Sequence, residues 1–553
     1  MQTNEDVLRA IPLGGVGEVG RNMMVLEYDG NMLVIDCGLM FPEHDMLGID
    51  IVIPDISYVV ERQESLLGVL ITHGHEDHHG ALPHLLRALD RPVPIYAGQL
   101  TRGLIQVKLK EHRVLDKANL RVVEAGDRVE IGPFEAEFFH VCHSIPDSMG
   151  IAVDTPVGTV VFSGEYKFDY TPTDGRLTDA QRLADYGGQG VLALFSDSTN
   201  VERVGYTPSE RAISEEFEKI FAQAKGRIIV ATFASNISRV QQVVSVARKY
   251  NRRIGLVGRS MVNNCHMAID LGYLDIGRDE LLRLEKIEQL PSRRVAIICT
   301  GTQGEPTSAL VRMANQEHRW VTIQEGDSVI LSASAIPGNE ELVHRTINSL
   351  FRLGAMVYYP PMQPVHVSGH ASQEEQKLLL TLTQPKFFVP VGGEYRHLVL
   401  HGQLAEQVGV SEDNIFVLES GKVIEFTEDS AHVRESVGGR YVYVDGLGVG
   451  DIGNIVLRDR HHLASDGFFI VVVALNRESG ELLDDVYVIS RGFVYVRESE
   501  ELLKEAKEQV VKALRRHGSH PARLDDTIKT VLSHFLYEQT KRRPMILPMV
   551  MEI

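Results

Sequence analysis

The sequence predicts an α/β protein built from about three or four domains. First, the chain has 553 residues, whereas a single domain usually has roughly 100 to 200. Second, short apolar runs separated by Gly, Pro and Asp fill the first 200 residues, a texture typical of strands. Third, helical and strand-like runs alternate from Ser209 onward. We therefore expect a strand-rich α/β layer, a parallel-sheet insert and a compact α+β tail domain.

Composition places the chain among soluble globular proteins. A hydrophobic fraction of 44%, a charged fraction of 24% and 48 glycines exclude a disordered, collagen-like or coiled-coil chain. No run approaches about 18 consecutive apolar residues, so no membrane-spanning helix is expected. Glu5 and Asp6 lie where a signal peptide would need basic and then apolar residues. We therefore expect a cytoplasmic protein without a membrane partner.

Cysteine content and net charge narrow the function classes. The four cysteines have no CxxC spacing, so neither a disulfide framework nor a thiolate zinc site is suggested, and reduced, buried thiols are expected. The net charge of −19 argues against nonspecific attraction to a polyanion and against a histone-like or basic-tail binder. Phosphate binding depends on the local field of a groove and on any metal ions in it, however, so nucleic acid stays a candidate ligand.

Apolar patterns predict the elements of the first two domains. In the first 200 residues the expected helix is Ala81–Leu89, and the expected strands are Met23–Leu26, Met32–Ile35, Val69–Ile71 and Thr159–Phe162. Helix and strand alternation then predicts a parallel-sheet insert. Its expected helices are Glu210–Ala224 and Ser238–Tyr250, and its expected strands are Arg227–Thr232, Arg253–Val257 and Val295–Cys299.

The remainder of the chain returns to strands and ends in a small domain. Strands are expected at Lys386–Val391 and Lys422–Phe426, and the Gly-rich segment Asp445–Gly453 is expected to begin a linker. The tail domain is expected to contain three strands and two amphipathic helices. The strands are Phe468–Leu475, Asp485–Ser490 and Met545–Met551, and the helices are Glu498–Arg516 and Leu524–Gln539.

The sharpest chemical signal is the segment 72–80, THGHEDHHG, directly after the apolar run Val69–Ile71. A strand that ends in such a loop places several ligands at one sheet edge. Imidazole nitrogens suit Zn²⁺ or Mn²⁺, and a carboxylate can hold a second ion or orient a water. Two ions about 3.5 to 4 Å apart can clamp a phosphoryl group and supply hydroxide near neutral pH. The alternative is a solvated His-rich turn without a ligand.

Two further segments extend this pattern. His143, in the segment 142–148 (CHSIPDS), follows the strand-like run Phe134–Val141, and Glu165 ends the strand-like run before it in SGEY. Alone, His143 is more typical of a hydrogen-bonded structural residue, and Glu165 of a cap or turn residue. After an HxHxDH motif, both are better interpreted as metal ligands.

The order of these motifs resembles the metallo-β-lactamase fold. Five more motifs resemble the β-CASP subgroup, and specifically bacterial ribonuclease J: SDSTN at 196–200, ATFASN at 231–236, CTGTQGEP at 299–306, VSGHAS at 367–372 and PVGGEYRHL at 390–398. The resemblance covers essentially the whole chain. It implies an αββα sandwich at 1–207 and 361–450, an inserted α/β β-CASP domain at 208–360, a linker at 451–460 and an α+β C-terminal domain at 461–553.

The resemblance also implies the roles of individual residues. One metal ion would be held by His73, His75 and His143, a second by Asp77 and His78, and Glu165 would bridge them. The implied cofactor is Zn²⁺, one or two ions, with Mn²⁺ or Mg²⁺ able to support activity. Hydroxide supplied by the metals would attack the phosphorus in line, with Asp77 and His370 as the catalytic residues. His370 would steady the phosphate or help to protonate the leaving oxygen.

Two segments are implied to contact nucleotide phosphates, accept a 5′-monophosphate and favour 5′-to-3′ degradation. Small hydroxyl groups and free backbone N–H groups suit such a pocket because they approach an anion closely. SGHAS alone is equally well explained as a helix N-cap before Gln373 and Glu374, and the two roles are compatible. The implied residues are Ser235, Asn236 and Ile237, together with His366, Val367, Ser368, Gly369, His370 and Ala371.

The sequence departs from the family pattern at three positions. Glu165 stands where the family usually has an Asp bridge, and Gly392 stands where it usually has a His ligand of the second metal. Ser238 stands where a histidine is expected after ASN, which alters the expected phosphate pocket. His397 follows in sequence but is no obvious substitute. We therefore expect weakened occupancy of the second site and reduced hydrolysis, without loss of RNA binding.

Three functions remain open. The first is a metal-dependent ribonuclease with 5′-to-3′ exonuclease and endonuclease activity in RNA decay and maturation, including mRNA decay and rRNA processing. The second is a weakly active or noncatalytic partner subunit that binds RNA and an active paralogue. The third is a DNA-processing β-CASP nuclease. Single-stranded RNA is the expected ligand.

The resemblance implies further partners and one more ion. Homodimers or tetramers are expected, and the tail domain is either a dimerisation surface or an independently folded module. Other RNA-decay proteins or a paralogous subunit are further expected partners. A structural divalent cation such as Ca²⁺ is expected near Gly48, Asp50 and Asp445, although such an acidic loop is more often only solvated.

Overall fold

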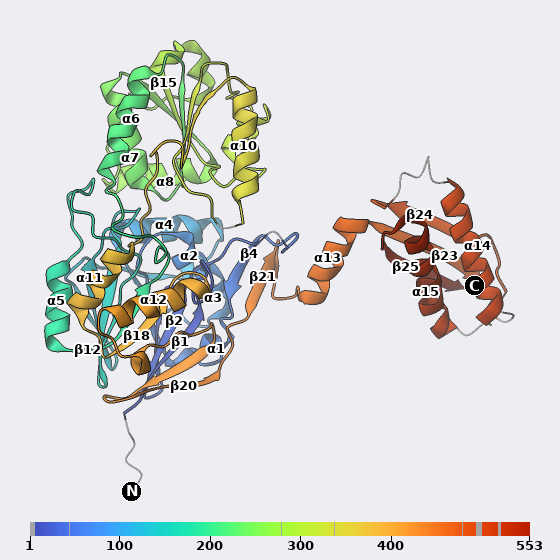
Figure 1. The fold of residues 1–553 in the computed structure, drawn as a ribbon, viewed down its shortest axis with the longest axis horizontal. Helices are drawn as coiled ribbons and strands as arrows, with labels where there is room; N and C mark the ends of the chain where they lie inside the picture. Colours follow the sequence, from blue (N-terminus) through green and yellow to red (C-terminus); the bar gives the residue numbers. More distant parts are fainter. Residues whose placement is uncertain are drawn as a thin grey trace, which may run out of the picture. The chain divides into compact units, whose positions relative to one another are not determined.

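The computed structural model describes residues 6–553 except 44, 278, 337, 478, 480, 494–499 and 518–520. The chain forms two compact units (Figure 1). The larger unit consists of residues 1–41 and 52–442, and the smaller one of residues 42–51 and 443–553.

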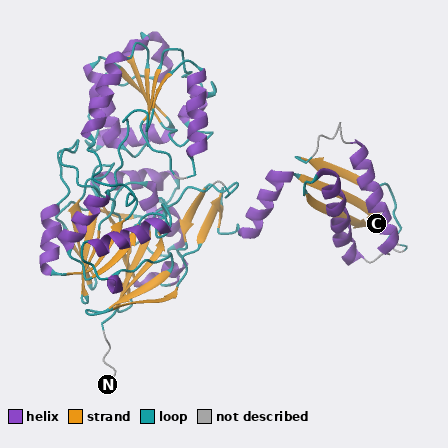
Figure 2. Cartoon of the chain, in the orientation of Figure 1, coloured by secondary structure: helices purple, strands orange, loops and turns teal. Residues whose placement is uncertain are grey.

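Two β-sheets pack face to face in the larger unit, and a single hydrophobic core lies between them (Figure 2). The first sheet has the order β20 (Ala431–Ser436), β19 (Lys422–Phe426), β1 (Leu8–Gly14), β2 (Met23–Tyr28), β3 (Asn31–Ile35), β5 (Leu66–Leu70), β6 (Pro94–Ala97), β7 (Asn119–Val122). The second has the order β18 (Phe387–Val391), β12 (Val191–Asp197), β11 (Gly158–Phe162), β10 (Met149–Thr155), β9 (Phe134–His140), β8 (Arg128–Ile131).

Helices cover the outer faces of this sandwich, and they pack against the side chains that point away from the core between the sheets. Successive side chains of a strand point to opposite faces. In β9, Phe138 joins the core between the sheets, whereas Phe139 joins an outer cluster with residues of three helices. These helices are α5 (Ala180–Gln189), α11 (Gln373–Thr383) and α12 (Tyr395–Gln407). Helix α4 (Gln99–Glu111) packs on β6 and β7 of the other sheet. The αββα sandwich implied by the resemblance is therefore confirmed.

Residues after β12 form the inserted α/β domain. Its five strands are all parallel, and helices cover both faces of the sheet (Figure 1). The strand order is β14 (Arg253–Val257), β15 (Val295–Cys299), β13 (Ile228–Ala231), β16 (Ser328–Leu331), β17 (Met356–Tyr358). One face carries α6 (Arg211–Gln223), α7 (Ile237–Lys249) and α8 (Arg259–Asp270), and the other carries α9 (Ala309–Ala314) and α10 (Glu340–Arg352). The chain then returns to the sandwich, where β18 pairs in parallel with β12.

The smaller unit contains the α+β tail. Side chains of β23 (Phe468–Leu475) alternate between buried and half-buried, and the buried ones pack against two helices, α14 (Glu500–His517) and α15 (Pro521–Thr540). β23 pairs antiparallel with β24 (Tyr487–Arg491) and parallel with β25 (Met545–Glu552). Residues 498 and 499 of the expected first helix lie outside the described residues.

The structure contains several helices that the sequence did not predict, α4, α5, α8, α10 and α12 among them, and it has further elements around the expected linker. Helices α4 and α5 are absent from the prediction because glycines interrupt their apolar pattern. A Cβ atom at Gly103 of α4 would lie 2.4 Å from the sulfur of Met267, and one at Gly187 of α5 would lie 2.1 Å from the carbonyl oxygen of Leu382. In the expected linker, β21 (Tyr441–Asp445) and β22 (Gly448–Val449) form a hairpin, and helix α13 (Asn454–Asp466) follows.

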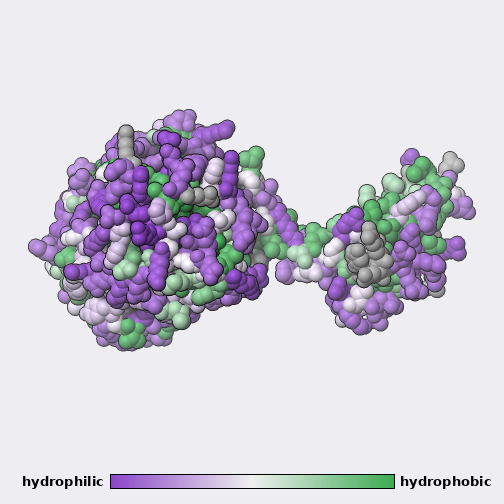
Figure 3. Space-filling model, turned by 90° about the horizontal axis from the view of Figure 1, so that it is seen from above, coloured by the Kyte–Doolittle hydropathy of each residue, from purple (hydrophilic) through white to green (hydrophobic). Residues whose placement is uncertain are grey.

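The remaining elements are short. They are β4 (Ile51–Pro54), α1 (Ser57–Glu61), α2 (Glu76–His79) and α3 (Leu82–Ala88). All four cysteines are buried and unpaired, as expected. Among the described residues, no helix combines the length and the apolar character that crossing a membrane requires. Figure 3 shows hydrophilic residues over most of one face, with smaller hydrophobic patches between them.

A buried histidine gives the fold a predictable pH response. His401 of α12 is 0% exposed, lies 4.9 Å from the ring of Phe388, and its Nδ1 atom is 3.0 Å from the hydroxyl of Ser198. Burial lowers the pKa of His401 to about 3. The unfolded chain binds this proton near pH 6.5, so stability present above that pH is lost as the pH falls toward 3.

We therefore expect His401→Gln to flatten the decline of the thermal unfolding midpoint between pH 6.5 and 4.5. One proton accounts for at most about 1.4 kcal/mol per pH unit. His432→Gln, which removes an exposed histidine, should leave the decline unchanged. Parallel curves for the parent and His401→Gln would contradict this assignment.

Candidate metal centre

The HxHxDH loop lies at the end of β5 and is anchored by Asp36. β3 and β5 are parallel neighbours, so the residues that follow them meet at one sheet edge. Asp36 follows β3, is 6% exposed, and accepts hydrogen bonds from the backbone N–H of Thr72 (2.8 Å) and from Nδ1 of His78 (2.7 Å). The hydroxyl of Thr72 also donates to Asp36 and lies 3.1 Å from Nδ1 of His73. Asp36 thus fixes both ends of the loop.

The first group of ligand atoms consists of three imidazole nitrogens and one carboxylate oxygen. Nδ1 of His75 lies 3.0 Å from Nε2 of His73 and 3.2 Å from Nε2 of His143. Oε2 of Glu165 lies 3.3 Å and 3.0 Å from these two Nε2 atoms. Tetrahedral bonds of about 2.0 to 2.1 Å place ligand atoms about 3.3 Å apart, so the spacing fits a Zn²⁺-sized ion.

Hydrogen bonds behind the ligands direct their lone pairs inward. Nδ1 of His143 donates to the carbonyl of Gly369 (2.9 Å), which leaves Nε2 free to bind an ion. Burial and neighbouring histidines hold the pKa of His73 and of His75 well below the usual value. Both rings are therefore neutral, and a neutral imidazole is the form that binds metals.

The second group shares Glu165 with the first and is smaller. It contains Asp77, His78 and Glu165. Nε2 of His78 lies 3.1 Å from Oε1 of Glu165 and 3.8 Å from Oδ2 of Asp77. The two oxygens of Glu165 therefore face different groups, as a bridging carboxylate requires. Burial opposes a charge on His78, but Asp36, Glu165 and Asp77 outweigh it and raise the pKa of His78 well above the usual value.

His370 faces the shared carboxylate and is paired with Asp197. Nδ1 of His370 lies 2.7 Å from Oδ2 of Asp197, and its Nε2 lies 4.0 Å from Oε2 of Glu165. Burial opposes protonation, but Asp197 and Glu165 raise the pKa of His370 to about 9. Asp197 ends β12, which lies beside β11 in the sheet, so this carboxylate reaches the same edge as Glu165.

Asp36 and Asp197 hold side chains of the site, and the sequence analysis gave neither of them a role. Each is a carboxylate at the end of a strand, and each of these strands is a parallel neighbour of a strand that leads to a metal ligand. That shared position is the signal that could have found them.

The two segments expected to contact RNA phosphate lie together, but several of their side chains point into cores. Asn236 caps α7 by accepting the N–H of Arg239 (2.9 Å). Ile237 and Val367 belong to one hydrophobic cluster, and Ala371 belongs to another. Only the backbone groups of these three residues could meet a phosphate. Burial lowers the pKa of His366 to about 3, so its ring is neutral.

The segment that carries His370 is held from several sides. The carboxylate of Glu375 is fully buried and accepts N–H groups of Phe168 (2.8 Å), Thr207 (2.7 Å) and Ser372 (2.9 Å). Ser372 caps α11, as the N-cap interpretation of SGHAS predicts. Glu375 therefore joins the segment after Glu165 to the segment of His370.

Four family models match successive parts of the chain. They are the metallo-beta-lactamase superfamily at 16–207, the ribonuclease J beta-CASP domain at 225–350, the Zn-dependent metallo-hydrolase RNA specificity domain at 361–418 and the ribonuclease J C-terminal domain at 455–553. Ribonuclease J2 of Bacillus subtilis (strain 168) is 43% identical over 554 residues, which cover 100% of this chain and 99% of that protein. Ribonuclease J 2 of Staphylococcus aureus (strain MRSA252) is 42% identical over 555 residues, with the same coverage. The chain belongs to the ribonuclease J family.

A solved structure supports the fold independently. A protein of unknown function from Enterococcus faecalis V583 matches with a TM-score of 0.54 at 13% identity, over 76% of this chain and 100% of that chain. At this identity, the likeness concerns the fold alone.

The position expected to hold a family histidine is constrained by its backbone. Gly392 has a φ of +66°, and a Cβ atom there would lie 3.0 Å from Oδ1 of Asp197. His397 has other partners, because its Nδ1 accepts the N–H of Glu394 (3.2 Å) and its Nε2 lies 3.4 Å from Glu202. Among the residues that the structure describes, the second group therefore has three ligand atoms.

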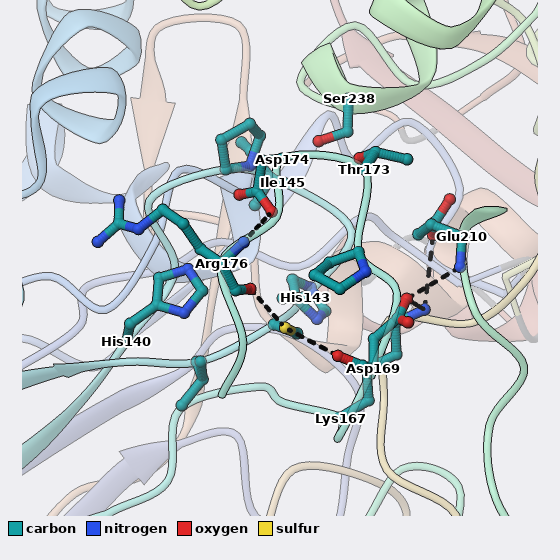
Figure 4. A pocket seen from close by; sticks show the side chains of 14 residues that line it. His140, His143, Ile145, Lys167, Asp169, Thr173, Asp174, Arg176, Glu210 and Ser238 are labelled. Atoms are coloured by element: carbon teal, nitrogen blue, oxygen red, sulfur yellow. Dashed lines mark hydrogen bonds and ion pairs between the residues drawn. The ribbon is translucent and has the colours of Figure 1, made fainter. Parts of the chain in front are cut away.

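Ser238, where the sequence analysis expected a histidine, lines a small pocket beside His143 (Figure 4). The pocket is also lined by Lys167, Asp169 and Glu210, so charged groups of both signs face it.

At the expected calcium position, a guanidinium group is present. Arg460 donates to Asp445 (2.6 Å) and to the carbonyl of Leu47 (2.9 Å), and the N–H of Gly446 donates to Asp50 (2.8 Å). A Cβ atom at Gly48 would lie 2.7 Å from Nη1 of Arg460. These carboxylates are thus already paired with donors.

We expect Asp36→Asn to weaken the second ion more than the first. The substitution removes the charge that orients His78, and loss of such a partner typically costs about 10- to 100-fold in metal affinity. Elemental analysis after dialysis against graded chelator would measure the ions kept per chain. Asp154→Asn, at an exposed position of β10, is the control. Equal loss of both ions, or of neither, would contradict the assignment.

Proposed function

We propose that the protein is a metal-dependent ribonuclease that hydrolyses single-stranded RNA, prefers a 5′-monophosphate end, and acts as both 5′-to-3′ exonuclease and endonuclease in RNA decay and maturation. The observation that carries the proposal is the pair of ligand groups joined by Glu165. Two divalent ions held this close can act on one phosphodiester. The match to an RNA specificity domain at 361–418 supports RNA as the substrate class.

The residues fit the roles that hydrolysis needs. Bound divalent ions such as Zn²⁺ or Mn²⁺ would supply a water nucleophile that is deprotonated near neutral pH and would neutralise phosphate charge. His73, His75 and His143 would hold one ion, Asp77 and His78 the other, with Glu165 between them. Protonated His370, oriented by Asp197, would stabilise the phosphate or donate a proton to the leaving oxygen. Backbone N–H groups of 235–237 and 366–371 would hold the neighbouring phosphate.

We further propose that activity is attenuated. The second group has three ligand atoms among the described residues, and Glu165 is one methylene longer than the aspartate that the family pattern leads us to expect. Ligand distances are held within about 0.2 Å in metal sites, so a longer bridge and a missing ligand both weaken the second ion. The second candidate function, a weakly active subunit that binds RNA and pairs with a second copy or an active paralogue, follows from the same observation.

We expect Glu165→Asp combined with Gly392→His to raise the Mn²⁺ content toward two ions per chain and to raise turnover at least about tenfold. Turnover would be measured on a 5′-monophosphorylated single-stranded RNA, with a matched DNA strand beside it. His75→Ala gives the baseline without the first ion. Equal rates for the parent and the double variant would contradict attenuation. Faster cleavage of DNA would contradict the substrate class, because the 2′-hydroxyl is the difference between the strands.

If the protein is a noncatalytic subunit, the same assay gives a different result. The parent protein binds the RNA without cleaving it, and cleavage occurs only after an active family member is added. No RNA binding by the parent would contradict both candidate functions.

A further inference from the structure

A fully buried lysine connects the two loops that carry metal ligands. Lys167 is 0% exposed and lies two residues after Glu165. Its backbone N–H donates to the carbonyl of Cys142 (2.8 Å), and Cys142 directly precedes His143. The hydrolysis proposed above does not use the ammonium group of Lys167. Its presence in the interior therefore needs an explanation, because an unpaired buried charge is strongly destabilising.

The ammonium group contacts two segments far away in the sequence. Nζ of Lys167 lies 3.3 Å from the carbonyl oxygens of Pro208 and Ser368. It also lies 3.7 Å from carboxylate oxygens of Asp169 and Glu210. Figure 4 shows Lys167, Asp169 and Glu210 converging at one side of the pocket beside His143.

Glu210 extends this contact to a second buried cation. Its Oε2 accepts a hydrogen bond from Nη2 of Arg239 (2.6 Å), and its backbone N–H donates to Asp169 (2.9 Å). Arg239 is 0% exposed and donates to the carbonyl of Val365 (3.1 Å) and to the hydroxyl of Ser332. The network therefore binds the segment 365–370 at two carbonyls, those of Val365 and Ser368.

The charges of this network cancel. Lys167 and Arg239 are cations, Asp169 and Glu210 are carboxylates, and none of the four is more than 4% exposed. A balanced set avoids the penalty of an uncompensated interior charge. Hydrophobic side chains could fill the same space without any penalty for burying charge. What Lys167 and Arg239 provide in addition is hydrogen-bond donors to the carbonyls of Ser368 and Val365.

The segment 365–370 needs such donors because it has no repeating hydrogen bonds of its own. Between β17, which ends at Tyr358, and α11, which begins at Gln373, the described chain forms neither helix nor strand. Yet two groups in this segment serve the metal centre. The carbonyl of Gly369 orients His143, and the ring of His370 faces Glu165.

We propose that Lys167 is a positioning residue, whose ammonium group holds the Ser368 carbonyl so that Gly369 and His370 keep their places beside the metal ligands. This inference rests on the proposed ribonuclease function and deepens it. The contacts of its ammonium group are backbone carbonyls and two carboxylates, none of which belongs to the metal-ligand groups. Its effect passes through the backbone of residues 368–370.

The test compares Lys167→Met with Arg227→Met. Methionine keeps the length and volume of the lysine side chain but cannot donate. Arg227 and Asp327 form an equally buried ion pair in the inserted domain, with Nε and Oδ1 3.0 Å apart, and neither contacts the segment 365–370. Both substitutions remove a buried cation, so each is expected to lower the thermal unfolding midpoint. Only Lys167→Met is expected to free the His370 segment.

Two measurements distinguish a positioning role from a merely structural one. Hydrogen exchange of peptides covering 365–371 should become at least about tenfold faster in Lys167→Met and stay unchanged in Arg227→Met. On 5′-monophosphorylated RNA, Lys167→Met should lower kcat by about a hundredfold and change KM by less than about threefold, because displacement of a catalytic group affects the reaction more than binding. Unchanged exchange, or an equal loss of kcat in Arg227→Met, would overturn the proposal.

Lys167→Met combined with Asp169→Asn keeps the result interpretable if the single variant fails to fold. The double variant restores the charge balance but still lacks the donor to Ser368, so faster exchange is again expected, and parent-like exchange would overturn the proposal. Exchange needs no substrate. Absence of RNA turnover in the parent would thus contradict the proposed function, while the exchange result still decides whether Lys167 orders the segment.

Discussion

The close approach of several metal-ligand side chains is the constraint around which this centre is built. Three imidazole nitrogens and a carboxylate oxygen lie 3.0 to 3.3 Å apart in a largely buried place, where water screens them poorly. Side chains adopt such an arrangement only when the surrounding fold compels it. Thr72 fixes the far side of the His73 ring, and the carbonyl of Gly369 fixes that of His143. Asp36 holds Thr72 in turn, and it also fixes His78 of the second group. The favourable partner for the cluster is a small divalent cation.

Sheet topology explains how distant parts of the chain reach one place. β3 and β5 in one sheet, and β11 and β12 in the other, are parallel neighbours, so the residues that follow them emerge at common edges. Asp36 and the HxHxDH loop come from the first pair, and Glu165 and Asp197 from the second. The inserted domain then returns the chain through residues 365–370, which bring His370 to the same centre. An acidic protein can thus create a local site suited to a polyanion.

Short-range chemistry made much of the site predictable. HxHxDH, His143 and Glu165 could be recognised because metal ligands are rare side chains in tight spacing, and the structure gathers all of them. Asp36 was missed because a lone aspartate after a strand is indistinguishable from a turn residue. Asp197 lies in the motif SDSTN, but it received no role because its partner His370 is far away in the sequence. Some strands of the sandwich and the insert followed from apolar runs, among them β2, β3, β5, β11, β13, β14 and β15, whereas β1, β12 and β16 did not. Helices α4 and α5 could not be predicted in this way, because each contains a glycine, which has a low helix propensity. Gly103 and Gly187 are explained by close packing against a neighbouring helix.

Gly187 has a wider consequence. Its missing side chain lets the backbones of α5 and α11 touch, since the nearest atom is the carbonyl oxygen of Leu382 near the end of α11. At the other end of α11, Glu375 accepts the N–H of Ser372, which lies two residues after His370. Helix α11 is therefore held at both ends, and a displacement of its outer end would be transmitted toward His370. The lack of a side chain at residue 187, on the outer layer of the sandwich, thus bears on the geometry of the metal centre.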